Sequence, residues 1–69
     1  MNNLAHNLKR YRQLTNRTQK EMAELLGMLT NAYQKYEHGT REPRIDVLIQ
    51  IADILNVSLD DLVGRDFPK

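Results

Sequence analysis

Residues 18–37 read TQKEMAELLGMLTNAYQKYE and contain two short helical patterns separated by about three residues. In the first pattern, Thr18 and Glu21 have the spacing of a capping box, in which a hydroxyl and a carboxylate bind the first free backbone N–H groups of a helix. Gly27 is a natural stop for that helix because glycine tolerates a positive φ. The second pattern starts at Thr30 and predicts a helix that ends near Glu37.

Two helices joined this closely must cross steeply, which requires a small residue at their contact and a glycine where the chain reverses. Ala23 and Gly27 meet these two requirements. We expect the large apolar residues of the stretch to face inward, namely Met22, Leu25, Leu26, Met28, Tyr33 and Tyr36. The tyrosines could instead stack on the bases of a single strand, but their helical spacing favours packing in the core.

Outside this stretch, periodic apolar residues and caps predict three more helices. The first covers residues 3–14. Another starts at Arg44 or Ile45 and ends at residue 55, and its few polar positions predict a central, buried helix. Asn56 can adopt the left-handed cap after it, and a second capping box at residues 58–61 opens a short helix through residue 63. No alternating strand pattern occurs, so the predicted fold is all-α, with five helices in a domain over residues 1–64 and a tail over residues 65–69.

The length and composition exclude several classes of protein. A chain of 69 residues forms one small domain, and without cysteine it has neither a disulfide framework nor a thiol nucleophile. His6 and His38 lack a ligand partner at i+4, so structural or neutral roles are favoured over metal binding. Ser58, the only serine, is explained as a helix cap, and no glycine-rich phosphate loop is present. We therefore expect no enzyme activity, metal or cofactor.

No apolar run is long enough for a signal peptide or a membrane span, so the expected location is the cytoplasm. The charge is divided along the chain. Residues 1–44 carry eight Lys or Arg against four Glu, a net charge of +4, whereas residues 45–69 carry two against five Asp, a net charge of −3. This division is typical of a domain that presents one face to a polyanion, although a chance split of the charges is the alternative.

The side chains left to project from the helix that starts at Thr30 are suited to reading nucleic acid. Asn31 and Gln34 can pair with adenine through two hydrogen bonds, and Lys35 can donate to guanine. Thr30 can form a hydrogen bond or contact a thymine methyl group.

In the identity and spacing of its residues, the sequence resembles the phage repressor and Cro-like helix-turn-helix regulators. The matching residues extend over nearly the whole chain and are Leu8, Arg12, Thr18, Gln19, Met22, Ala23, Leu26, Gly27, Tyr33, Tyr36, Glu37, Gly39, Pro43, Leu48, Ile51, Ala52, Leu55, Val57, Ser58, Leu59, Asp60, Asp61 and Leu62. The resemblance implies a compact, lambda-repressor-like domain of five helices. Its second and third helices would form the helix-turn-helix, with the third lying in the major groove.

The resemblance also implies roles for individual residues. The base-contacting positions correspond to Leu29, Thr30, Asn31, Gln34 and Lys35. Thr18 and Gln19 correspond to a phosphate contact at the start of a helix, and Arg41 and Arg44 to a loop that grips the DNA backbone. Arg12 and Glu37 correspond to an internal ion pair.

Two positions depart from the family pattern. Leu29 stands where many members have Ser or Thr as a cap, so either Thr30 caps the helix instead or Leu29 reads a thymine methyl group. Arg17 stands where an apolar residue is common and is interpreted as an extra phosphate contact. Lys20, together with Lys9 and Arg10, is either part of a solvated face or a phosphate contact.

The predicted function is a sequence-specific regulator of transcription, a repressor, that binds an inverted repeat in double-stranded DNA as a homodimer. The expected dimer surface consists of Leu59, Leu62, Val63 and Phe67. No membrane or small-molecule partner is expected. The alternative is a protein-interaction module or an antitoxin-like adaptor on the same fold, and a third interpretation is one domain of a larger ligand-responsive repressor, for whose sensor this chain has no room.

Overall fold

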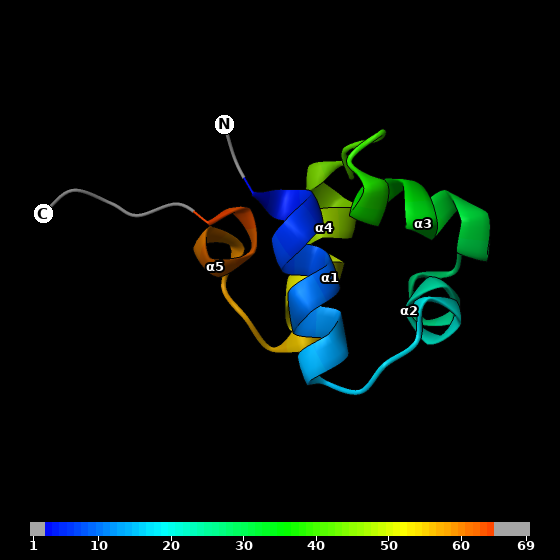
Figure 1. Cartoon of the computed structure of the whole chain (residues 1–69), viewed down its shortest axis with the longest axis horizontal. Coiled ribbons are helices and arrows are strands. Elements are labelled where there is room, and N and C mark those ends of the chain that lie inside the picture. Colours follow the sequence, from blue (N-terminus) through cyan, green and yellow to red (C-terminus); the bar gives the residue numbers. More distant parts are fainter. Residues whose placement is uncertain (1–2, 65–69) are drawn as a thin grey trace, which may run out of the picture.

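The computed structural model describes residues 3–64, which form five α-helices and no strand (Figure 1). The helices are α1 (Leu4–Leu14), α2 (Gln19–Leu26), α3 (Thr30–His38), α4 (Ile45–Leu55) and α5 (Leu59–Val63). The all-α prediction is confirmed, and the bounds differ from the predicted ones by about one residue. No helix in this part of the chain is both long enough and apolar enough to cross a membrane.

Local signals in the sequence mark the starts of α2 and α5 and the end of α4. Thr18 Oγ1 accepts a hydrogen bond of 3.0 Å from the backbone N–H of Glu21, whose carboxylate accepts one of 2.8 Å from the N–H of Thr18. Ser58 and Asp61 form the second capping box. Asn56 takes the left-handed conformation after α4 with a φ of 57°. Both capping boxes and the left-handed cap are therefore confirmed.

One core holds the helices together, and each helix contributes to it. The largest side chains that are fully buried are Leu8, Met22, Tyr33, Ile51 and Leu62. Tyr36 is also buried, and its ring meets that of Tyr33 edge to face at a centroid distance of 6.2 Å. The prediction that these two tyrosines pack in the core is confirmed.

The arrangement of the helices separates two ends of the molecule. In Figure 1, α1 lies between α5 on one side and the α2–α3 pair on the other, with α4 behind it. The backbone N–H of Asn3 donates to the carbonyl of Val63 at 3.0 Å, and the side chain of Asn7 donates to the carbonyl of Leu62 at 3.1 Å. These bonds fasten α5 to the first turns of α1, so that α5 lies far from α3.

Two predictions about burial are wrong. We expected α4 to be buried on nearly every side, but Ile45 is 64% exposed and Ile49 is 45% exposed. Ile51, Ala52 and Leu55 of this helix are buried in the core, and Val47, Leu48 and Ile54 pack against it while partly buried. The opposite side of α4 is exposed because the described chain has no further element to cover it. Leu25 was expected to face inward and is also exposed, since it lies on the outer face of α2.

Candidate nucleic-acid interface

The start of α3 is the most exposed apolar point of the helix-turn-helix. Leu29 is the N-cap residue, its side chain makes no capping hydrogen bond, and it is 74% exposed. The helix begins at Thr30, so Thr30 does not act as the cap in place of Leu29. The structure therefore excludes the first of the two alternatives, a cap formed by Thr30. It leaves the second, in which Leu29 faces outward.

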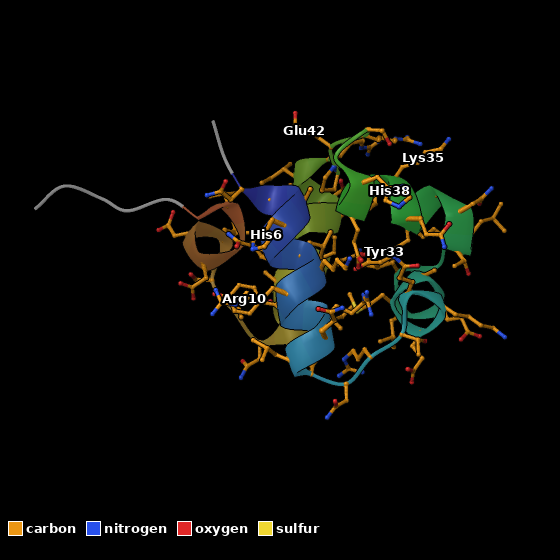
Figure 2. All side chains as sticks on the ribbon, viewed as in Figure 1. His6, Arg10, Tyr33, Lys35, His38 and Glu42 are labelled. Carbon is orange, nitrogen blue, oxygen red and sulfur yellow. The ribbon has the colours of Figure 1, made fainter. Side chains whose placement is uncertain are left out.

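Asn31 and Lys35 form the exposed face of α3. They lie one helical turn apart and are both exposed, so their side chains project from the same side. Figure 2 shows Lys35 at the outer surface, whereas Tyr33 points into the body of the molecule. Thr30 is half-buried beside them. The outer face of α3 therefore offers an amide and an ammonium group to a ligand.

Gln34 is oriented toward α2 instead. Its Nε2 donates to Oε1 of Gln19 at 3.0 Å, and Nε2 of Gln19 in turn donates to Oε1 of Glu37 at 3.1 Å. Both glutamines are half-buried. Gln34 thus fixes the orientation of Gln19 at the start of α2, a contact that the sequence analysis missed because it joins residues of two different helices.

Glu37 connects α1, α2 and α3 through a network of hydrogen bonds. Nε of Arg12 donates to Oε2 of Glu37 at 2.6 Å, and a second guanidinium nitrogen donates to Oε1 at 3.1 Å. Arg12 also donates to the carbonyl of Arg17 at 2.8 Å, which holds the turn before α2. The hydroxyl of Tyr33 donates to Oε2 at 2.6 Å. The expected Arg12–Glu37 pair is therefore present, with Tyr33 and Gln19 as partners that the sequence analysis did not find.

Burial and hydrogen bonding shift the pKa values in this network. Burial alone would raise the pKa of Glu37, but the hydrogen bonds from Arg12, Tyr33 and Gln19 outweigh it and lower that pKa. The bond to Glu37 raises the pKa of Arg12 above its ordinary value. Burial, followed by the bond to Glu37, raises the pKa of Tyr33. The network therefore stays charged at neutral pH and is a structural feature that sets the position of α3.

Exposed polar and basic groups flank α3 on two sides. Thr18 and Lys20 are exposed at the start of α2. Arg17, just before them, is half-buried, and its Nε is buried without a hydrogen-bond partner. Arg41 and Arg44 are exposed in the segment between α3 and α4. The cations predicted to contact phosphate thus lie just before α2 or in its first turn, and after α3, and Arg17 is less accessible than the others.

Arg44 and Arg41 each make a contact within the chain, Arg44 through its side chain and Arg41 through its backbone. A guanidinium nitrogen of Arg44 lies 3.5 Å from a carboxylate oxygen of Asp46, in a pair whose side chains are both largely exposed. The backbone N–H of Arg41 donates to the carbonyl of Lys35 at 3.4 Å, which holds the start of the loop against the end of α3. The side chain of Arg41 remains at the surface.

The residues expected at a dimer surface separate into three groups. Leu62 is fully buried in the core, so the prediction that its side chain lies at an interface is wrong. Leu59 is 37% exposed and Val63 is half-buried, so both reach the surface of α5. Phe67 lies outside the described residues.

His6 and His38 are both exposed, and Figure 2 shows them on α1 and α3. Within residues 3–64, no group of three His, Cys, Asp or Glu side chains is placed to hold a metal ion. The features of this surface are therefore an exposed helix face that can donate and accept hydrogen bonds, with cations on both sides of it.

Comparisons with known proteins agree with this geometry. The helix-turn-helix family model matches residues 8–62. The chain is 41% identical over 58 residues to the cryptic phage CTXphi transcriptional repressor RstR of Vibrio cholerae, a match that covers 84% of this chain and 52% of that protein. This chain thus spans about half the length of that relative.

Solved structures show the same fold. A transcriptional regulator from Listeria innocua superposes with a TM-score of 0.90 at 30% identity, covering all of this chain and 64% of that one. The biofilm regulator SinR, solved in complex with DNA, superposes with a TM-score of 0.77 at 25% identity, covering 86% of this chain and 95% of that one. With a family match over most of its residues, the chain belongs to the helix-turn-helix family.

Proposed function

We propose that this chain is a sequence-specific DNA-binding regulator of transcription, a repressor that acts in the cytoplasm and binds an inverted repeat as a homodimer. The observation that carries the proposal is the exposed face of α3, from which Asn31 and Lys35 project on the same side, with Leu29 exposed at the N-cap before it. The N-terminal residues of a recognition helix contact base edges in the major groove. RstR, a relative, is named a transcriptional repressor, and SinR was solved with DNA, which supports this assignment.

In this proposal the groups around α3 hold the sugar-phosphate backbone. Thr18, Gln19 and Lys20 lie at the start of α2, where free backbone N–H groups favour an anion. Arg41 and Arg44 contact phosphate on the other side of α3, and Arg17 adds a further positive charge. Thr30 contacts a base edge beside Asn31. Gln34 acts through Gln19, whose orientation it fixes, and reaches a base only with its remaining amide atoms.

The dimer would form through α4 and α5. These two helices pack against each other and expose Ile45, Ile49 and Leu59, with Val63 half-buried beside them. An exposed apolar surface of this kind is typical of a protein-protein contact. Two recognition helices are needed because one short helix reads few base pairs, whereas two half-sites one helical turn apart multiply the affinity.

The test is a binding selection on random double-stranded DNA at two salt concentrations. We expect enrichment of a two-fold symmetric site with half-sites separated by about 10 base pairs or a multiple of that. Weak binding that depends strongly on salt and enriches no motif would contradict the proposal. It would favour the alternative, an adaptor or antitoxin-like module that uses the same helices to bind a protein.

Two classes of variant separate base contacts from phosphate contacts. Asn31→Ala or Lys35→Ala should weaken binding to the selected site by about 1 to 3 kcal/mol and relax the base preference. Arg41→Ala should weaken binding to all sequences alike and lower the salt slope by about one. If Lys35→Ala changed the salt slope alone, Lys35 would be a phosphate contact and its assignment as a base contact would be wrong.

A further inference from the structure

The N-cap of α3 is occupied by a residue whose side chain does not cap the helix. Ser, Thr, Asp and Asn are preferred at this position because their side chains bind the free N–H groups of the first turn. Helices α2 and α5 of this chain begin with complete capping boxes at Thr18 and Ser58. Leu29 makes no such bond and is the most exposed of the large hydrophobic side chains in residues 3–64. Leu29 therefore provides no capping bond to α3 and exposes its apolar side chain to water.

The backbone keeps this side chain at the surface. The carbonyl of Leu29 accepts hydrogen bonds of 3.1 Å from the N–H groups of Ala32 and Tyr33, so Leu29 is fixed at the first turn of α3. In this position its side chain is 74% exposed. Asn31, two residues further along, is exposed as well. An incoming ligand can therefore reach Leu29 without rearrangement of the protein.

We propose that Leu29 is a specificity-determining residue that contacts the C5-methyl group of a pyrimidine in the major groove, either thymine or 5-methylcytosine. This inference rests on the proposed function, because it requires α3 to lie in the major groove. Apolar side chains contact the thymine methyl group there, and the methyl is what distinguishes thymine from uracil. Burial of one methyl against Leu29 corresponds to about a fourfold gain in affinity for each half-site.

The experiment uses the symmetric site obtained from the selection. Each thymine is replaced by deoxyuridine, one symmetric pair of positions at a time, and the dissociation constant is measured for the wild type and for Leu29→Ala. At one symmetric pair of positions, with both half-sites changed, we expect the affinity of the wild type to fall about 16-fold. The affinity of Leu29→Ala should hardly change. The inference is overturned if no thymine shows a uracil effect that disappears in Leu29→Ala.

A second comparison isolates the methyl group from the rest of the base. At the same position, C·G and 5-methyl-C·G pairs are compared, since they differ in the methyl group alone. We expect the wild type to bind the methylated site about fourfold more tightly for each half-site and Leu29→Ala to bind the two sites equally. Equal binding by the wild type would contradict the inference.

Leu29→Ser completes the test, because serine restores a capping side chain while removing the apolar contact. We expect its melting temperature to rise by about 4 to 8 °C and its discrimination between thymine and uracil to be lost. A lower melting temperature would show that Leu29 stabilises the fold and would overturn the inference. If the selection yields no symmetric site, the proposed function fails instead, so the two failures are distinguishable.

Discussion

Glu37 shows how one carboxylate can fix the position of a helix, here α3. It accepts hydrogen bonds from Arg12, Gln19 and Tyr33, which belong to α1, α2 and α3. The Arg12–Glu37 pair was expected from the resemblance to a family. The contribution of Tyr33 could have been found from the sequence, since Tyr33 and Glu37 lie four residues apart on α3. That of Gln19 could not, because it depends on how two helices cross.

Replacement of the Glu37 carboxylate should destabilise the fold. In Glu37→Gln the guanidinium of Arg12 loses its buried counter-charge, and we expect the free energy of unfolding in urea to fall by about 3 kcal/mol or more. The matched control is Asp46→Asn, which breaks the exposed Arg44–Asp46 pair and should cost less than about 1 kcal/mol. Equal losses for the two variants would show that burial does not strengthen the first pair.

The same carboxylate predicts a pH dependence of stability. Because the pKa of Glu37 is lower in the folded chain than in the unfolded one, its stabilising effect is complete above the unfolded value, near 4.5. It is lost as the pH falls through the folded value. We expect the melting temperature of the wild type to drop below about pH 4.5 and that of Glu37→Gln to drop less.

Some acid sensitivity should remain in Glu37→Gln. The pKa of Glu21 is also lowered, first by the backbone N–H of Thr18 and then by the hydroxyl of Thr18. Identical melting curves against pH for the wild type and Glu37→Gln would contradict the role given to Glu37.

At the scale of whole elements, helix ends could be predicted from the sequence more accurately than helix faces. The capping boxes at Thr18 and Ser58 are local, because the bonds that define them span three residues. Burial is not local. Ile49 has the sequence character of a core residue and lies at the surface, since burial requires a neighbouring element that the pattern of one helix does not reveal.

Two glycines at helix ends provide a matched test of the packing between α1 and α5. Gly27 and Gly64 have nearly equal φ values of 69° and 70°, so alanine introduces similar backbone strain at both. At Gly27 the new Cβ would meet nothing within 4 Å, whereas at Gly64 it would lie 2.9 Å from Nδ2 of Asn7 and 3.3 Å from Cβ of Asn3. Asn7 holds the end of α5 through that nitrogen.

We therefore expect Gly27→Ala to lower the free energy of unfolding by about 1 to 2 kcal/mol, and Gly64→Ala to lower it by more. Chemical denaturation of the two variants under the same conditions measures the difference. If the two losses were equal, the added Cβ at Gly64 would not disturb the contact between α5 and the first turns of α1.

At the scale of the whole molecule, charge and apolar surface lie on different parts of the fold. Residues 1–44, which include α2 and α3, have a net charge of +4, and residues 45–69 have a net charge of −3. The exposed side chains Ile45, Ile49 and Leu59 belong to the acidic part. A surface for a second copy on α4 and α5 would therefore leave the basic part free to face the DNA.

This separation allows the proposed dimer surface to be tested independently of the proposed DNA contacts. We expect Ile49→Asp and Leu59→Asp to reduce the mass measured by light scattering at micromolar concentration from that of a dimer to that of a monomer, because each places a charge in an apolar contact. Both positions are exposed, so the variants should keep the melting temperature of the wild type. Leu62→Asp would not test the dimer surface, because it places a charge in the core and would unfold the chain.

Asn31→Ala is the control for these variants, since it changes the surface of α3 and should leave the mass unchanged. The monomeric variants should bind a single half-site as the wild type does and lose affinity for the complete site, because the gain from linking two half-sites requires the dimer. If Ile49→Asp and Leu59→Asp both kept the dimer mass, the second copy would bind elsewhere on the molecule. If the mass fell while affinity for the complete site stayed the same, each recognition helix would act alone, and the inverted-repeat model would be wrong.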